Sequence, residues 1–149
     1  MDLPKLNLPK ANLKTKLVKG TTQVFDVVRK KYLILTPEEW VRQHFICYLN
    51  IQKKYPLGLM GVEKMVRYNN MHTRTDIVLY TIEGKPHMIV ECKAPKVKIT
   101  QDTFNQIAKY NSQLEVQFLV VTNGIEHFCC QMDYQNHFIS FLDDIPVFS

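Results

Sequence analysis

Three residues near the middle of the chain, Asp76, Glu91 and Lys93, have the types and the spacing to act together in catalysis. Two runs of strand-forming residues flank Glu83-Gly84, which fits a two-residue hairpin turn. Counting outward from that turn sets Asp76 opposite Glu91, and directly opposed residues share a face with side chains roughly 5 Å apart. Lys93 points to the same face, roughly 7 Å further along its strand.

Two facing carboxylates are costly unless positive charge lies between them, and a divalent metal ion would supply it. Mg²⁺ prefers oxygen ligands and keeps several waters, so a few carboxylates suffice to hold it. Such an ion activates water and polarises phosphoryl oxygens, as phosphodiester hydrolysis requires, and a nearby lysine stabilises the transition state. The competing interpretation is a surface ion pair of Asp76 with Arg74 or Lys93. Glu91 and Lys93 could likewise be a polar strand end, and for each residue alone the ordinary interpretation is favoured. Only the set completed by Gln106 and Tyr110, which could themselves be exposed helix residues, favours a catalytic site.

A strong helix start precedes this hairpin. Thr36 is the expected N-cap, Pro37 fits the first helical position and Glu39 completes a capping box, so a helix should run to about Lys53. Its buried stripe is expected to contain Val41, Phe45, Tyr48 and Leu49. Two interpretations of Glu38 stay open: it lies on the core side, where a carboxylate needs a partner, or it favours the helix dipole at the surface.

A second helix is predicted from Thr100 to about Ser112, with Gln106 and Tyr110 together on its flank. Its face towards the sheet should carry Phe104, Ile107, Ala108 and Asn111. Further strands are expected at 24–28, 32–35, 62–68, 118–121, 125–130 and 138–142, with turns at Asn69-Asn70 and Asn123-Gly124. Residues 88–90 are apolar on both faces, which predicts a central strand. The order of elements predicts an α/β fold: a mixed central sheet flanked by helices, with extra C-terminal strands.

The formal charge of +5 is unevenly distributed. Residues 1–20 carry five lysines against Asp2, whereas the rest has 14 basic and 13 acidic residues. We therefore divide the chain into a basic, proline-containing arm at 1–20 and a single domain at 21–149. The prolines exclude a regular helix in the arm, which either lies along the body or stays mobile. Its lysines suit a phosphate backbone, with a solubilising tail as the alternative: Lys5, Lys10, Lys14, Lys16 and Lys19.

Hydrophobic residues make up 46% of the 149 residues, which is typical of a globular domain. No run reaches the length of a membrane span, and no apolar signal core opens the chain. The four cysteines fit neither a disulfide framework nor a zinc ribbon, so we expect them to be reduced in a cytoplasmic protein. A metal or redox site at His127 with Cys129-Cys130 is disfavoured, because adjacent strand residues point to opposite faces.

Five motifs follow one another along the chain: Thr36-Pro37-Glu38-Glu39-Trp40-Val41-Arg42-Gln43, Arg74-Thr75-Asp76, Glu91-Cys92-Lys93-Ala94-Pro95, Gln106-x-x-x-Tyr110 and Thr122-Asn123-Gly124. Together they resemble the N-terminal nuclease domain of type I restriction enzyme R subunits, within the PD-(D/E)XK nuclease superfamily. Thr75 stands where the name-giving proline of the superfamily would be. The resemblance covers roughly residues 25–130 and implies a restriction-endonuclease-like αβββαβ core.

The resemblance implies a role for each matching residue. Asp76 and Glu91 would be metal ligands, with the backbone carbonyl of Cys92 as a further ligand. Lys93 would orient or activate the attacking water, or stabilise the developing phosphorane charge. Glu38 matches the helix glutamate that often completes such a site. Three further matches would support the site or contact DNA: Gln106, Tyr110 and Arg74.

The leading hypothesis is therefore a Mg²⁺-dependent DNA endonuclease domain that leaves 5′-phosphates, with Mn²⁺ as a substitute ion. The chain ends at Ser149 without a phosphate-binding G-x-x-x-x-G-K loop, so translocation is expected to be absent or to come from a partner such as a motor or specificity subunit. One alternative is a non-catalytic module that binds DNA or a partner protein in a restriction, defence or repair complex. Another is an interaction protein that kept the fold without touching nucleic acid. No membrane partner is expected.

Overall fold

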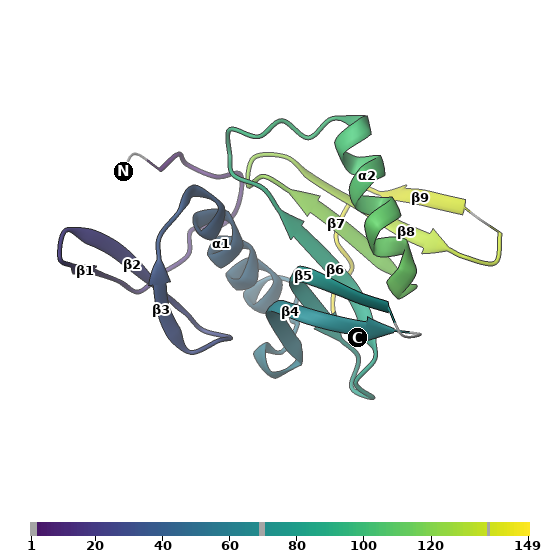
Figure 1. Ribbon diagram of the computed structural model, residues 1–149, viewed down its shortest axis with the longest axis horizontal. Helices are drawn as coiled ribbons and strands as arrows, with labels where there is room; N and C mark the ends of the chain where they lie inside the picture. Colours follow the sequence, from purple (N-terminus) through teal and green to yellow (C-terminus); the bar gives the residue numbers. More distant parts are fainter. Residues whose placement is uncertain (1–2, 69–70, 137) are drawn as a thin grey trace.

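The computed structural model describes residues 3–68, 71–136 and 138–149, which form two β-sheets and two α-helices (Figure 1). The first sheet is antiparallel and contains β1 (Thr15–Val18), β2 (Thr21–Asp26) and β3 (Lys31–Ile34). The second sheet contains β4 (Met60–Tyr68), β5 (Met71–Tyr80), β6 (Pro86–Cys92), β7 (Phe118–Thr122), β8 (His127–Asp133) and β9 (Phe138–Leu142). The helices are α1 (Pro37–Ile51) and α2 (Gln101–Asn111), and short 3₁₀ turns follow each of them.

The six-stranded sheet has the spatial order β4-β5-β6-β7-β8-β9. β6 and β7 are parallel, and the other neighbouring strands are antiparallel. A parallel pair needs a crossover connection, and α2 lies within that connection. β6 is an interior strand, as its apolar residues 88–90 predict. The predicted α/β fold with a mixed sheet, flanking helices and additional strands is thus confirmed.

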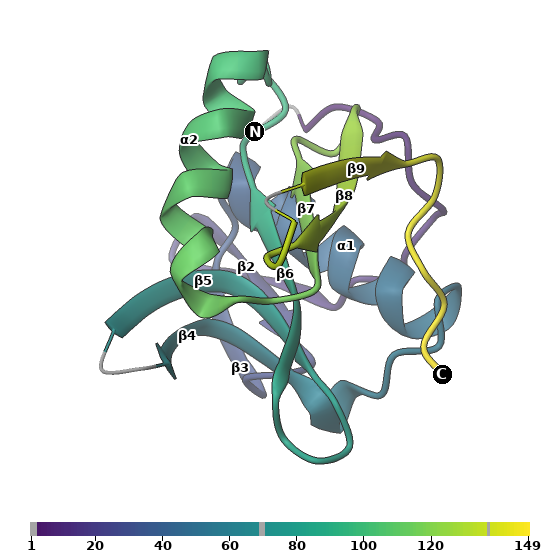
Figure 2. The ribbon, with the colours of Figure 1, turned by 90° about the vertical axis from the view of Figure 1, so that its right-hand side faces the viewer.

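The two helices cover opposite faces of this sheet (Figure 2). Phe45 and Leu49 of α1 share one buried cluster with Ile77 of β5. Phe104 and Ala108 of α2 belong to a second cluster, on the other face. Both predicted sheet-facing stripes are therefore confirmed. Each helix starts where the sequence predicts, because a threonine hydroxyl caps its first turn.

The hairpin between β5 and β6 has a longer connection than the predicted Glu83-Gly84 turn. The connection spans residues 81–85, and β6 begins at Pro86. A proline has no N–H to donate to the ladder, which disfavours regular pairing at that end. A register irregularity at the end of β5 offsets the extra residues, so that Ile77 pairs with Val90. The turn prediction was wrong in length, yet the register that it implied is the observed one.

The N-terminal segment lies along the body, which is the first of the two alternatives left open by the sequence. Leu6 is buried, and the Asn7 N–H donates to the carbonyl of Gly124 at 2.8 Å. Gly124 has a φ of +86°, and a Cβ there would meet a methyl group of Leu6 at 2.7 Å. Glycine therefore allows the segment to pass close to this turn. The end of the segment assigned to the arm forms β1, a strand that the sequence did not predict.

Several boundaries differ by a few residues from expectation. α1 ends at Ile51 rather than near Lys53, and β8 begins at His127 because the preceding residues form a turn with asparagine side-chain contacts. The predicted turn at Asn69-Asn70 lies outside the described residues. The four cysteines are free, as predicted. In the part of the chain that the structure describes, no helix has the length and apolar character needed to cross a membrane.

Candidate active site

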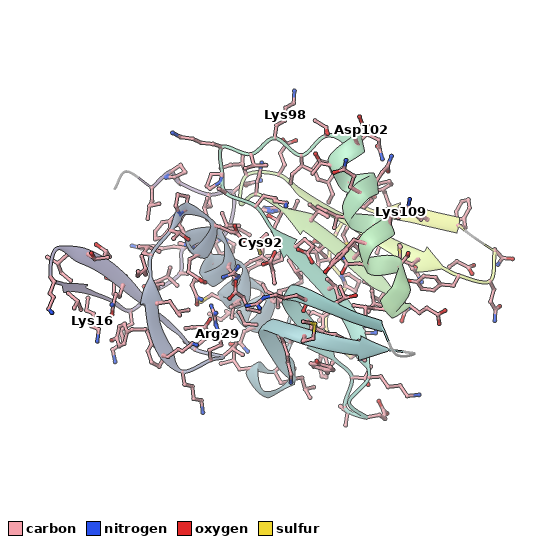
Figure 3. All side chains as sticks on the ribbon, in the orientation of Figure 1. Lys16, Arg29, Cys92, Lys98, Asp102 and Lys109 are labelled. Atoms are coloured by element: carbon pink, nitrogen blue, oxygen red, sulfur yellow. The ribbon has the colours of Figure 1, made fainter. Side chains whose placement is uncertain are left out.

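The candidate site lies where β5 and β6 separate, close to the first turns of α1. The ladder between these strands ends at the Ile77–Val90 pair, and one further step sets Asp76 opposite Glu91. The backbone N–H of Cys92 donates to Asp76 Oδ2 at 2.8 Å. The Asp76 carboxylate therefore stands in for the backbone carbonyl that would accept this hydrogen bond in a regular ladder. Figure 3 shows Cys92 beside α1, near the end of β6. The structure thus brings Asp76 and Glu91 together, as the strand count predicts.

Glu91 is the least compensated carboxylate of the site. Burial, the charge of Asp76 and a hydrogen bond with Asp76 raise the pKa of Glu91 to about 8, although Lys93 and Asn111 act in the opposite direction. Its Oε1 atom is buried and has no hydrogen-bond partner among the described residues. A buried acceptor without a donor is unfavourable, and a cation or a proton would relieve it.

Arg42 of α1 reaches into the site, although the sequence assigned it no role there. Its Nη2 atom lies 3.0 Å from Asp76 Oδ1, and its Nη1 atom lies 2.6 Å from Glu39 Oε1. Burial acts to lower the pKa of this guanidinium, but the surrounding carboxylates, Glu39 first among them, outweigh it and raise the pKa. Arg42 therefore stays charged and neutralises part of the acidic cluster.

Glu63 of β4 is a second residue that the sequence interpretation missed. Its Oε1 atom accepts from Arg42 at 3.3 Å, and its Oε2 atom lies 3.4 Å from Arg29. The β4–β5 register places Val62 opposite Ile77, so Glu63 comes opposite Asp76. The signal was available, because counting across the predicted Asn69-Asn70 turn gives the same pairing. Glu63 also has a φ of +48°, a left-handed conformation that is uncommon for a glutamate.

Glu39 has a different role from the expected one in a capping box. Its own N–H donates to Thr36 Oγ1 at 3.0 Å, which confirms the N-cap. Its buried carboxylate accepts from Arg29, Arg42 and Gln43. Among the described residues, none of its hydrogen bonds returns to the Thr36 N–H. The reciprocal half of the box was therefore wrong, because two arginines compete for the same oxygens.

Glu38 faces the candidate site from the surface. Its side chain is 47% exposed and its Oε1 atom lies 3.2 Å from Arg42 Nη2. Burial and the charge of Asp76 raise the pKa of Glu38, whereas Arg42 and Lys93 act to lower it. Glu38 is thus within electrostatic reach of both Asp76 and Lys93. Glu91 interacts with the same two residues, Asp76 and Lys93.

The other three predicted residues lie further out. Arg74 pairs with Glu63 at 3.4 Å, and its side chain is 64% exposed. Gln106 and Tyr110 lie on the exposed flank of α2, as predicted. In the described part of the chain, no hydrogen bond or ion pair joins these three residues to Asp76. The α2 residue that interacts with Glu91 is Asn111, which is buried.

The lysines of the predicted arm are all exposed: Lys5, Lys10, Lys14, Lys16 and Lys19. The disfavoured metal interpretation of His127 is also replaced by an ordinary explanation. Its Nδ1 atom bonds the Thr122 hydroxyl at 2.7 Å, and its Nε2 atom bonds the Asn7 carbonyl at 2.8 Å. Both ring nitrogens therefore have partners, and the imidazole of β8 links the N-terminal segment to β7.

The donor set at Asp76 and Glu91 suits a hard cation. Its side-chain donors are carboxylate oxygens, and the orphaned Glu91 Oε1 is a buried acceptor that an ion would satisfy. No cluster of three or more histidine, cysteine, aspartate or glutamate side chains is poised to hold a metal within the described ranges. Water would have to fill the remaining positions, as Mg²⁺ commonly allows. The residues present fit a Mg²⁺ site built on two carboxylates.

The fold and the acidic cluster together define a class of protein: an α/β protein whose mixed sheet and two helices are compatible with a restriction-endonuclease-like core. The family model described as "Type I restriction enzyme R protein N terminus (HSDR_N)" matches residues 37–146. The chain therefore belongs to this family. A search of curated proteins gives no match.

Proposed function

We propose that this protein is a Mg²⁺-dependent DNA endonuclease domain of the PD-(D/E)XK type, which hydrolyses phosphodiester bonds. The observation that carries the proposal is the buried, unpaired Oε1 atom of Glu91 beside Asp76. Folding places two carboxylates together at a cost, and a cation bound between them would remove that cost. Family membership supports the same conclusion.

In the proposed mechanism, Asp76, Glu91 and the backbone carbonyl of Cys92 would hold the ion. When bound, Mg²⁺, or Mn²⁺ in its place, would supply Lewis acidity and a water activated at neutral pH. Glu91 would be a ligand only in its ionised form, so its raised pKa makes metal binding compete with protonation. The Cys92 N–H and the Arg42 guanidinium fix the orientation of the Asp76 carboxylate.

The ammonium group of Lys93 would supply positive charge next to the phosphoryl oxygens of the DNA. It follows β6 directly, and its N–H donates to the Thr122 carbonyl at 2.8 Å, which fixes its backbone. A positioned ammonium stabilises the charge that develops in the transition state. Glu38 would complete the ion's environment from the side of α1. Gln106, Tyr110 and Arg74 would contact the DNA backbone from exposed positions.

The proposed substrate is DNA in the cytoplasm, with cutting directed by a partner such as a motor or specificity subunit. A second candidate function is a non-catalytic module that binds DNA or a partner protein. One observation favours it: Arg42 already neutralises one oxygen of Asp76 at 3.0 Å, which lowers the need for a metal ion.

Nicking of supercoiled plasmid with Mg²⁺ tests the proposal. We expect Asp76→Asn and Lys93→Ala each to slow nicking by about a hundredfold or more, as loss of a transition-state stabiliser does. Glu83→Gln, on the exposed loop of the same hairpin, is the matched control and should nick like the wild type. If the wild type is no faster than Asp76→Asn, the catalytic proposal fails and the binding module stands.

A further inference from the structure

The positive charge of the chain is concentrated in the three-stranded sheet. Residues 14–35 contain six basic residues and one acidic residue, which gives +5, the formal net charge of the whole chain. The acidic residue, Asp26, is fully buried and bonds Arg29. The five lysines are exposed, and none has an ion-pair partner within the described part of the protein: Lys14, Lys16, Lys19, Lys30 and Lys31. Concentrated, unpaired positive charge suits a polyanion.

One face of this sheet combines cationic and aromatic side chains. Directly opposed residues share a face, and the register aligns Lys16 with Gln23 and Gln23 with Ile34. Phe25 and Tyr32 are opposed on the same face. On the other face Val24 is fully buried in the protein. The face with Lys16 and Tyr32 is therefore the outer face of the sheet.

The aromatic rings of the outer face already hold lysine ammonium groups. The ring centroids of Phe25 and Tyr32 lie 5.2 Å apart in an edge-to-face arrangement. Lys16 Nζ lies 3.9 Å from the Tyr32 centroid, and Lys14 Nζ lies 5.8 Å from that of Phe25. Each ring thus has a π-face that is accessible to an ammonium group, and the ring and the ammonium are not covalently linked or joined by an ion pair. A base stacking on the ring would release the ammonium to a phosphate of the same strand.

The outer face borders a hollow that extends to the α1 side of the candidate active site. The hollow of about 520 Å³ is lined on one side by Gln23, Tyr32 and Ile34, and on the other by Glu38 and Arg42. Figure 3 shows Lys16 on the sheet formed by β1 to β3, with Arg29 between that sheet and the body of the protein. A strand lying on the outer face would therefore run towards Glu38.

We propose that the outer face of the β1–β3 sheet binds a DNA strand with exposed bases and leads it into the candidate active site. Tyr32 and Phe25 stack on bases, while Lys14 and Lys16 contact the phosphates. Bases offer their π-faces only where they are not stacked in a duplex, so the aromatic component selects single-stranded or unpaired DNA. The destination of the strand rests on the proposed nuclease function, whereas the binding does not.

Binding of a 20-nucleotide oligo(dT) in EDTA tests the surface by fluorescence anisotropy. We expect Tyr32→Ala to weaken binding about tenfold, and Tyr32→Phe to retain it, because the ring is what stacks. Lys16→Ala should weaken binding and reduce the slope of log affinity against log salt by about 0.7, the value for one phosphate contact on a single strand. Lys98→Ala removes the same charge from the loop before α2, far from Lys16 in Figure 3, and should leave affinity unchanged.

Two further ligands make the result decisive. An abasic oligonucleotide keeps the phosphates, so Tyr32→Ala should have no effect on its binding. A duplex of the same length should be nearly insensitive to Tyr32→Ala. Equal losses on all three ligands, or no loss on oligo(dT) in a variant that melts like the wild type, would overturn the proposal. Because the binding assay contains EDTA and the nicking assay contains Mg²⁺, the two assays test the binding surface and the nuclease function separately. If Tyr32→Ala loses binding to oligo(dT) while the wild type shows no nicking, only the nuclease function is refuted.

Discussion

Glu39, which is buried, and Glu91, which has one buried oxygen, are carboxylates with opposite environments. Glu39 accepts hydrogen bonds from two arginines and a glutamine. Glu91 has an oxygen without a partner among the described residues, and burial together with Asp76 raises its pKa to about 8. The comparison separates two uses of buried charge. Compensated charge fixes the geometry, while uncompensated charge marks a place that a further cation can enter.

Arg42 connects these two environments. It contacts Glu39 at 2.6 Å and Asp76 at 3.0 Å, so one guanidinium belongs to both. Because Glu39 also bonds Arg29, which bonds Asp26, the first environment extends to the three-stranded sheet. The position of the Asp76 carboxylate thus depends on charges contributed by the N-terminal region, and the comparison can be tested by removing one carboxylate at a time.

The largest expected effect is on stability. Glu39→Gln should lower the free energy of unfolding by about 3 kcal/mol, because it leaves the buried Arg42 and the largely buried Arg29 short of a counter-charge. Glu91→Gln, the matched substitution, should leave the free energy of unfolding unchanged or raise it, because it removes a repulsion with Asp76. Urea unfolding at pH 8 in EDTA measures both. Equal destabilisation by the two substitutions would refute the distinction between the environments.

A pH dependence follows from the raised pKa of Glu91. Between its ordinary value of 4.5 and about 8, the folded protein holds this proton while the unfolded chain has released it. The free energy of unfolding of the metal-free protein should therefore fall as pH rises through this window, by up to about 1.4 kcal/mol per unit. Urea unfolding at pH 5.5, 6.5 and 7.5 should show this contribution, and Glu91→Gln should lack it.

The same proton links pH to metal binding. A bound ion needs the ionised form of Glu91, so Mg²⁺ should raise the melting temperature more at pH 8 than at pH 6. Asp76→Asn serves as the control and should abolish this gain at both pH values. A gain that is equal at pH 6 and pH 8 would remove Glu91 from the ligands.

The smallest stability effect is expected at Glu38. Its side chain is about half exposed, so solvent screens its ion pair with Arg42 and Glu38→Gln should change the free energy of unfolding by less than about 1 kcal/mol. If Glu38 belongs to the active site, plasmid nicking should nevertheless slow. Unchanged nicking by a stable Glu38→Gln protein would exclude Glu38 from the active site and leave it as a surface ion-pair partner of Arg42.

Much of the fold was predictable because its signals are local. The period of apolar residues gave both helices, and a strand alternates its side chains strictly, so counting put Asp76 opposite Glu91. Thr36 and Pro37 predicted the start of the first helix. The same counting across Asn69-Asn70 would have found Glu63.

The roles of Arg42 and Glu39 were not predictable in this way. The role of Arg42 depends on a long side chain that meets Glu63 of β4 and Asp76 of β5, and such contacts leave no periodic signal along the chain. Glu39 matched a local capping motif, but Arg29, in the turn before β3, and Arg42, three residues later on α1, offered stronger, charge-assisted hydrogen bonds. The capping rule fails here because it considers only the backbone of the first turn and not the arginine side chains that compete for the same carboxylate.

The irregular pairing at the end of β5 has a consequence for how this protein can change. Ile77 and Val90 keep their register because both are buried in the cluster beneath α1, while the loop at 81–85 departs from a minimal turn. Core packing, rather than the loop, therefore sets which residues face each other. The hairpin tip is a site where insertions, deletions or a grafted peptide tag should be tolerated, since its length is decoupled from the alignment of Asp76 and Glu91.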